Sequence, residues 1–345
     1  MSWRIKGNGT GEDLLYSQAG TPSLDLRFAA TKSLNDYVSG NNLITFTRAS
    51  SGTYTDSAGV LQAAANNVPR FDHDPVTGES LGLLIEEERT NLLLNSGTLS
   101  TQSVTVTAVA HTLSFTGTGT ITLTGTSTAG PLVGTGTGES NRVSLTFTPT
   151  AGSLTLTVSG TITHAQLEIG AFRTSYIATT GAAATRSADV ASITGSAFSG
   201  WYRQDEGTVF VEAKNYPHPV TGEALVPLAF SDNTYNNRIT LAGSTGNNQF
   251  NFDVVSAGSS QRTILGNFVS SGLKASGGYK STGSAGSLDG AATVTSNTPN
   301  IPSVIGRLDI GQAHDGNNVL NGCISRLTYW PVRLSNEVLQ RITQP

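Results

Sequence analysis

Residues 70–95 read RFDHDPVTGESLGLLIEEERTNLLLN and form the most charged run of the chain. Eight charged residues fall within Arg70–Arg89, whereas Ser96–Thr180 holds only four. Asp74–Gly78 predicts a tight turn, because proline fixes φ at about −65° and glycine accepts positive φ. Leu81–Ile85 then predicts a buried strand, and Glu86–Arg89 predicts the solvated corner where that strand reaches the surface. The stretch therefore indicates a structural joint between an irregular N-terminal segment and a long Thr/Gly-rich region.

The same stretch carries a resemblance to known proteins. Residues 71–96, FDHDPVTGESLGLLIEEERTNLLLNS, resemble a segment of tail-fibre and head-fibre-like structural proteins of tailed bacteriophages, where it usually precedes a carbohydrate-binding-module-like β-sandwich. The resemblance implies a virion component that is assembled in the host cytoplasm and exposed on the particle surface. It also implies a homotrimer that contacts other virion proteins through its N-terminal segment and host cell-surface polysaccharide elsewhere.

Composition limits the classes of function. A chain of 345 residues can hold two or three domains, and 13% charged residues with a net charge of −4 offer no basic face for nucleic acid. The 39 glycines and abundant threonine favour sandwiches and barrels. The single cysteine, Cys323, excludes a disulfide framework within one chain and is expected to be a buried thiol. No apolar run approaches the ~20 residues of a membrane span, so we expect a soluble, unprocessed protein with no membrane insertion.

The N-terminal part, residues 1–95, is expected to be an irregular particle-attachment segment. Met1–Gly20 is polar and glycine-rich, and two interpretations stay open: a frayed terminus, or an arm that docks on the particle. Leu24–Phe28 and Leu43–Arg48 alternate apolar with polar residues and predict strands, and Thr53–Val60 predicts a hairpin. Because large apolar residues are few, we expect these strands to complete the following sandwich or to pack against symmetry mates.

Residues 96–195 predict a carbohydrate-binding-module-like β-sandwich. Four runs alternate apolar residues with Thr or Ser, which places one face inward and a hydroxyl-bearing face outward: Val104–Val106, Ile121–Thr124, Val143–Phe147 and Leu154–Val158. Ala165–Gly170 with Phe172–Tyr176 resembles the last strand of the phage domain. The threonine face fits ordinary solvent-facing strands or a flat glycan surface. Exposed aromatic residues are scarce here, so we favour a spacer.

Residues 196–345 regain charges and aromatic residues and predict further strands, Gly322–Trp330 among them. Ser335 is expected to cap a short helix with Val338, Leu339 and Ile342 on one face. Ser287–Gly290, the I-x-R-L-x-Y run from Ile324 and the L-S-x-E-x-L run from Leu334 resemble the laminin-G/concanavalin-A-like jelly roll. That fold hosts lectins, glycosidases and adhesive domains alike. The predicted fold class is therefore all-β, with tandem antiparallel β-sandwiches (jelly rolls) and the laminin-G/concanavalin-A-like one at the C-terminal end.

The sequence gives little support for an enzyme. Glucanases with the concanavalin-A-like fold carry carboxylates as Glu-x-Asp-x-Glu, because retaining hydrolysis needs two carboxyls about 5 Å apart. No such cluster appears, and Asp74 is better explained as a turn cap than as the partner of Asp72. We therefore expect no enzyme, with polysaccharide depolymerisation as the weaker alternative. A deep cleft lined by two opposed acids would contradict this expectation.

Metal and cofactor sites are not expected either. Asp309, Asp315 and Asn317 could supply oxygen ligands to Ca²⁺, but Asp, Asn and Gly are also ordinary hairpin residues, and we favour the turn. The five histidines are scattered without zinc-ligand spacing.

Glycan contact is the remaining chemistry. Aromatic faces can stack on sugars while Asn and Arg side chains bond their hydroxyls, which suggests these ligand-binding candidates in the C-terminal domain: Trp201, Tyr202, Tyr235, Asn236, Arg238 and Tyr279. The alternative is that the rings plug the edges of a sandwich. The favoured hypothesis is a phage fibre or spike protein that binds host cell-surface glycan through its C-terminal β-sandwich. The second is a purely structural capsid-decoration or tail-adaptor protein.

Overall fold

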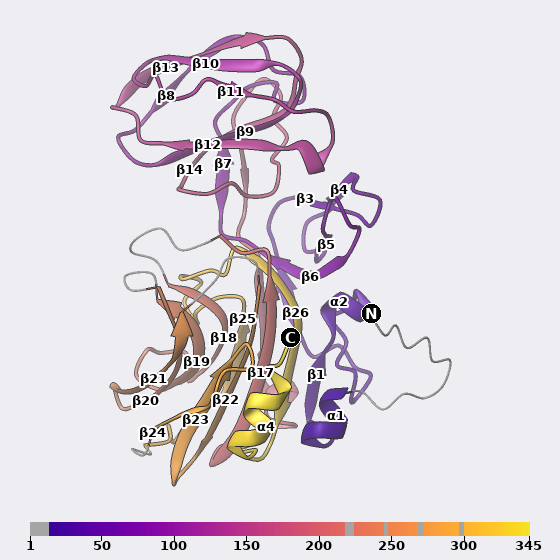
Figure 1. Cartoon of the computed structure of the whole chain (residues 1–345), viewed down its shortest axis with the longest axis vertical. Coiled ribbons are helices and arrows are strands. Elements are labelled where there is room, and N and C mark those ends of the chain that lie inside the picture. The colour runs from indigo at the N-terminus through magenta and orange to yellow at the C-terminus, as the bar shows by residue number, and fades with distance from the viewer. Residues whose placement is uncertain (1–13, 218–223, 245–247, 268–271, 297–299) are drawn as a thin grey trace.

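The structure is a computed structural model that describes residues 14–217, 224–244, 248–267, 272–296 and 300–345. Every strand pair in these ranges is antiparallel, which confirms the predicted all-β fold class. Two β bodies are stacked along the long axis, with a small sandwich above a larger one (Figure 1). Within the described ranges, no helix combines the length and apolar character that a membrane crossing requires.

The larger sandwich consists of two sheets packed over one core. The first sheet has the order β24-β23-β22-β17-β26-β6-β5, with β1 also paired to β26. Its strands are β1 (Leu24–Leu26), β5 (Phe71–His73), β6 (Ser80–Ile85), β17 (Glu206–Lys214), β22 (Gly272–Lys280), β23 (Gly283–Leu288), β24 (Val294–Ser296) and β26 (Gly322–Trp330). The second sheet has the order β2-β16-β25-β18-β19-β20-β21. Its strands are β2 (Thr45–Thr47), β16 (Val190–Thr194), β18 (Leu225–Ser231), β19 (Arg238–Ser244), β20 (Gln249–Ser256), β21 (Ser259–Asn267) and β25 (Arg307–Ile310).

Alternation along these strands builds the core. In β20, Phe250, Phe252 and Val254 point inward, so Asn251 and Asp253 belong to the opposite face of the second sheet. The far face of the first sheet is covered by α4 (Asn336–Ile342), whose Ile342 packs with Phe210 and Trp330. The Ser335 hydroxyl accepts a hydrogen bond from the Val338 amide, as the capping pattern predicted.

The small sandwich pairs a four-stranded sheet, β11-β10-β13-β8, with a three-stranded sheet, β12-β9-β14. Its strands are β8 (Gln102–Val106), β9 (His111–Gly117), β10 (Thr120–Gly125), β11 (Leu132–Val133), β12 (Val143–Phe147), β13 (Gly152–Ser159) and β14 (Ile162–Ile169). The predicted alternating runs fall in β8, β10, β12 and β13, and their inward residues join the core around Leu113 and Phe115. The short helix η1 (Glu139–Asn141) precedes β12.

Strand pairing changes the expected organisation of residues 1–95. β1, β5 and β6 enter the first sheet of the larger sandwich, and β2 enters the second, so this region is built into the C-terminal sandwich. These strands were expected to complete the following sandwich or to pack against symmetry mates. Instead, β1, β2 and β6 pair with strands more than a hundred residues away, and β5 joins the sheet through β6, because their apolar residues extend the larger core.

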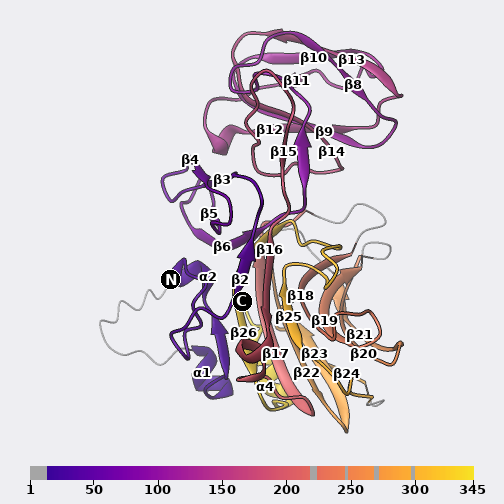
Figure 2. The same ribbon diagram turned by 180° about the vertical axis from the view of Figure 1, so that it is seen from behind.

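The small sandwich is therefore an insertion in the larger one. A two-stranded ribbon of β7 (Arg89–Asn91) and β15 (Ala184–Arg186) connects the two bodies, as Figure 2 shows from behind. Beside the ribbon lies the predicted hairpin, β3 (Gly52–Thr55) with β4 (Leu61–Ala64). Three short helices complete the fold: α1 (Leu14–Ala19), α2 (Phe28–Thr31) and α3 (Gly195–Ser199). Most of the proposed docking arm, Met1–Asp13, lies outside the described residues.

Candidate functional site

The charged run of the opening stretch ends in a buried ion cluster, here called the joint cluster. It consists of Arg48, Arg70, Glu86, Arg186 and Asp189, each at most 4% exposed. Arg70 Nη1 lies 2.8 Å from Glu86 Oε2, and Arg48 Nη1 lies 3.0 Å from Asp189 Oδ1. Arg70 Nη2 also pairs with Asp189. The prediction of a solvated corner at Glu86–Arg89 is therefore wrong at Glu86, because partners distant in sequence surround it.

The joint cluster also holds the small sandwich. Ser175, beyond β14, donates to Glu86 through its amide (2.7 Å) and its hydroxyl (2.6 Å). Burial alone would raise the pKa of Glu86, but Arg186, Arg70 and the bonds from Ser175 outweigh it and lower the pKa to about 2. The cluster is thus the structural joint that the sequence predicted, formed by buried charge. Buried pairs of this kind persist only when partners satisfy them.

The predicted glycan residues separate into two groups. Trp201 and Tyr279 are buried, and both contribute to the core of the larger sandwich. Half-buried Tyr202 stacks on Phe198, with ring centroids 4.6 Å apart. These three rings fill the sandwich, which is the alternative that the sequence left open. Tyr235, Asn236 and Arg238 lie at the surface end of β18 and β19.

Tyr235 and Arg238 border a hollow of about 150 Å³ on the outer face of the second sheet, here called the sheet pocket. Its polar lining comprises Ser231, Tyr235, Arg238, Thr240, Asn251, Asp253, Arg262, His314 and Asn318. Asn236 is exposed in the same turn but does not line the hollow. Asn251, Asp253 and Arg262 were not among the predicted site residues. The alternation of β20 could have revealed the first two, since it turns them away from the core.

The turn between β18 and β19 positions the Tyr235 ring. Asp232 accepts hydrogen bonds from the Thr234 amide (2.9 Å) and from Asn237 Nδ2 (2.7 Å), which closes the turn. The Tyr235 hydroxyl donates to Asp315 Oδ2 at 2.9 Å, and its ring meets His314 edge-on with centroids 4.5 Å apart. Burial and Asp315 raise the pKa of Tyr235. The Arg238 guanidinium carbon lies over the ring, 5.5 Å from its centroid, yet Tyr235 is still 45% exposed, so part of the side chain is accessible to a ligand.

Charged and amide groups form the floor of the sheet pocket. Asp253 is buried and accepts from Ser260 Oγ at 2.6 Å and Arg238 Nη2 at 3.1 Å, while Arg262 Nη2 lies 3.6 Å away. The Arg262 side chain is 51% exposed. Asn251 is buried, and its Oδ1 has no hydrogen-bond partner among the described residues. The floor therefore offers a guanidinium donor and an unused amide acceptor to a ligand.

The calcium candidates have other partners. Asp315 Oδ1 and Oδ2 accept from the Asn317 amide (3.1 Å) and Asn317 Nδ2 (2.7 Å), and Asp309 pairs with Arg307 Nη2 at 2.5 Å. Burial would raise the pKa of Asp315, but the bonds from Asn317 and Tyr235 outweigh it and lower that pKa. Across the described ranges, no three His, Cys, Asp or Glu residues gather as a metal site. Hairpin chemistry accounts for Asp315 and Asn317. Cys323, expected to be a buried thiol, is buried and free.

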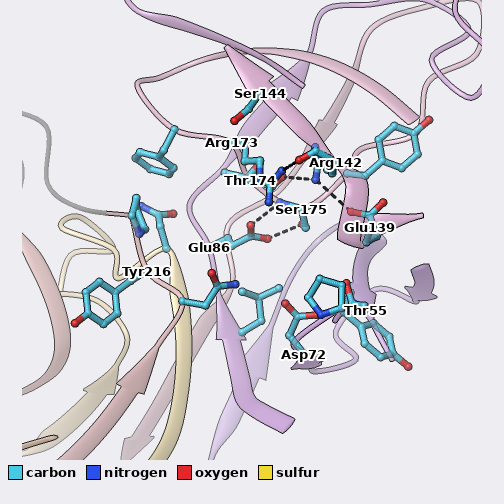
Figure 3. A pocket seen from close by; sticks show the side chains of 18 of the residues that line it. Thr55, Asp72, Glu86, Glu139, Arg142, Ser144, Arg173, Thr174, Ser175 and Tyr216 are labelled. Atoms are coloured by element: carbon cyan, nitrogen blue, oxygen red, sulfur yellow. Dashed lines mark hydrogen bonds and ion pairs between the residues drawn. The ribbon is translucent and has the colours of Figure 1, made fainter. Parts of the chain in front are cut away.

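A second hollow, here called the junction cleft, lies between the two sandwiches and measures about 440 Å³. Asp72 of β5, Glu86 beyond β6 and Glu139 of η1 surround it, together with Arg142 and Arg173 (Figure 3). Acids from both sandwiches thus line one cleft. From the sequence, we took a deep cleft with two opposed acids as the observation that would contradict a protein without enzymatic activity. Glu86 is engaged in the joint cluster, which leaves Asp72 and Glu139 as the carboxyls that can meet a ligand.

Comparison with solved structures yields distant likenesses. No protein-family model matches the chain, and no curated protein matches it. A solved NanB sialidase from Streptococcus pneumoniae superposes with a TM-score of 0.37 at 13% identity, over 44% of this chain and 26% of the sialidase. The CBM40 of a Ruminococcus gnavus IT-sialidase gives 0.35 at 13% identity, over 43% of this chain and 87% of that domain. The binding domain of botulinum neurotoxin DC superposes with a TM-score of 0.35 at 7% identity, over 45% of this chain and 39% of that one.

Proposed function

We propose that this protein binds a cell-surface glycan at the sheet pocket, as a fibre or spike component of a tailed-bacteriophage virion. The single observation that carries the binding role is the exposed Tyr235 ring above a floor with Arg262 and Asn251. A ring face accepts the apolar side of a sugar, and the guanidinium and amide groups bond its hydroxyls. The virion role, the homotrimer and the attachment of the N-terminal segment are supported only by the resemblance of residues 71–96.

The arrangement at the sheet pocket fits binding without bond cleavage. Its buried carboxylate, Asp253, already accepts from Ser260 and Arg238. Glycoside hydrolysis needs a second carboxyl across the sugar, and no Asp or Glu other than Asp253 lines this hollow in the described ranges. We therefore propose a binding protein that is not an enzyme, and the junction cleft, where Asp72 and Glu139 come from the two sandwiches, keeps polysaccharide depolymerisation as the weaker alternative. Release of reducing sugar from host polysaccharide by the full chain would contradict this.

The test uses the full chain, because strands from residues 24–85 complete the sandwich that carries the sheet pocket. A glycan array and a host-cell adsorption assay compare wild type with Tyr235→Ala. The expected loss of affinity is about tenfold or more, as for an anchoring aromatic residue. Tyr37→Ala is the matched control, since Tyr37 is 57% exposed and lies under Arg27 as Tyr235 lies under Arg238.

Three outcomes decide the proposal. Selective loss with Tyr235→Ala supports glycan binding at the sheet pocket. Equal loss in both tyrosine variants contradicts the assignment to this pocket. If the full chain binds no glycan and does not compete with intact particles for host cells, the receptor role fails. The purely structural capsid-decoration or tail-adaptor role then replaces it.

A further inference from the structure

We propose that the junction cleft is a second saccharide site, which takes a short uncharged oligosaccharide between the two sandwiches. Its residues are separate from those of the sheet pocket, so the inference goes beyond the proposed function and does not depend on it. The volume of about 440 Å³ falls within the roughly 300–1,000 Å³ of typical ligand sites.

Glu139 is the strongest indication of a missing ligand. Its side chain is 9% exposed, and its Oε1 has no hydrogen-bond partner among the described residues. Arg142 Nη1 and His164 Nδ1 each lie 3.8 Å from one of its oxygens, beyond hydrogen-bond distance. Buried carboxylate oxygens nearly always accept a hydrogen bond. A sugar hydroxyl in the cleft supplies the missing donor.

Asp72 adds a second acceptor from the larger sandwich. Its Oδ1 accepts the Thr55 amide at 2.6 Å, and its side chain lines the cleft. Burial and the negative charge of Glu86 raise the pKa of Asp72 to about 6. They outweigh the bond from Thr55 and the charge of Arg70, which lower it. Near neutral pH this carboxyl therefore exists in both forms, and it can accept from or donate to a hydroxyl.

Donors complete the polar lining. Arg173 is exposed, and its one described hydrogen bond goes to the Arg142 carbonyl. Ser144 adds an exposed hydroxyl from β12. Two acids, Asp72 and Glu139, face two arginines, Arg142 and Arg173, so the pocket carries little net charge outside the joint cluster.

This balance selects the class of ligand. A phosphate would be repelled by Glu139, and a metal ion would lack ligands, because no three His, Cys, Asp or Glu groups gather in the described ranges. A polyhydroxylated, uncharged molecule matches both donors and acceptors. The half-buried rings of Tyr54 and Phe172 supply apolar faces for the sugar carbons.

The experiment starts from the full chain with Tyr235→Ala and Arg238→Ala, which disable the sheet pocket. An array of uncharged di- to tetrasaccharides of hexoses and N-acetylhexosamines is the probe, and calorimetry measures the affinity of each saccharide that binds. Adding Glu139→Gln and Arg173→Ala is expected to weaken binding about tenfold or more, because hydrogen bonds to charged groups are lost. Adding Glu337→Gln and Arg341→Ala, at two exposed positions of α4, makes the same charge change and is expected to alter affinity less than about twofold.

A second variant guards against misfolding. Ser144→Phe fills the cleft from an exposed position whose hydroxyl makes no described hydrogen bond, and it is expected to abolish the same binding with an unchanged melting temperature. The inference is overturned if the sheet-pocket variant binds no uncharged saccharide at millimolar concentration, or if the cleft substitutions leave its affinity unchanged. If only the Tyr235→Ala and Arg238→Ala substitutions abolish saccharide binding, the junction site is ruled out and the proposed function stands. If only the cleft substitutions abolish it, the sheet pocket is ruled out as the glycan site and the junction site stands.

Discussion

Arg70 and Arg262 both pair with an aspartate, but their surroundings differ completely. Arg70 is buried, and its guanidinium donates to the Thr53 carbonyl, Glu86, Ser175 and Asp189. Arg262 is half exposed, and its closest acid oxygen lies 3.6 Å away on Asp253. Both terminal nitrogens of Arg70, Nη1 and Nη2, thus donate within the protein, while its Nε has no hydrogen-bond partner among the described residues. The Arg262 side chain in the sheet pocket is instead 51% exposed to solvent.

This difference separates a structural network from the network that we propose to bind a ligand. A buried charge without partners is strongly destabilising, so the joint cluster stabilises the fold only as a complete set. Its members come from the loop after β2, from the segments before β5 and β16, and from the ends of β6 and β15. Through the bonds from Ser175 to Glu86, the cluster also ties the small sandwich to the larger one. An exposed pair is worth little to stability, so it can exchange its partner for a ligand at small cost.

The largest expected effect follows from breaking the buried network. Arg70→Ala removes the partner of two buried carboxylates, Glu86 and Asp189, and should lower the free energy of unfolding by about 3–5 kcal/mol. Urea unfolding monitored by circular dichroism measures this loss. Arg262→Ala is the matched control from the exposed network. Equal stability of the two variants would show that burial does not distinguish the networks.

A smaller effect should come from Asp72, which borders the joint cluster and titrates in the opposite sense to Glu86. The pKa of Asp72 is about 6 in the fold against 3.8 ordinarily, so its contribution is fully present below about pH 3.8 and is lost as pH rises through about 6. We expect wild type to lose about 1–3 kcal/mol across that window relative to Asp72→Asn. Unfolding free energies at pH 4, 5, 6 and 7 for both proteins provide the measurement.

Glu86 does not obscure this comparison. Its pKa is about 2 in the fold against 4.5 ordinarily, so its contribution is present above about pH 4.5 and is lost only as pH falls through about 2. Parallel pH profiles for wild type and Asp72→Asn would show that Asp72 titrates in the fold as it does in the unfolded chain.

Local patterns predicted much of the fold. The alternation of Leu154–Val158 marked a strand of the small sandwich, and Ser335 marked the start of α4, because both signals depend on near neighbours. The burial of Glu86 could not be read in the same way. Its partners Arg70 and Arg186 are 16 and 100 residues away in the sequence. A run of charged residues has the same local pattern whether or not the fold brings such partners to it, so the pattern does not predict burial.

The candidate site was predicted less well for a related reason. Trp201 follows α3 near polar residues, and only the packing of Phe198, Phe230 and Tyr329 around it makes it part of the core. Tyr235 was predicted to be accessible, and it does lie at the surface, because a turn rich in Asp and Asn holds it there. Arg262 was not among the predicted residues, because its place beside Asp253 depends on the register between β20 and β21.

The smallest stability effect is expected at Arg262, where the comparison becomes sharpest. Arg262→Ala should change the free energy of unfolding by less than about 0.5 kcal/mol, since the side chain is half exposed and its ion pair is long. The same substitution should weaken glycan binding about tenfold, because it removes the free donor of the sheet pocket. Urea unfolding and the glycan array on one preparation measure both quantities. If the variant loses stability and keeps its affinity for glycan, Arg262 is a structural residue like Arg70 and does not bind the ligand.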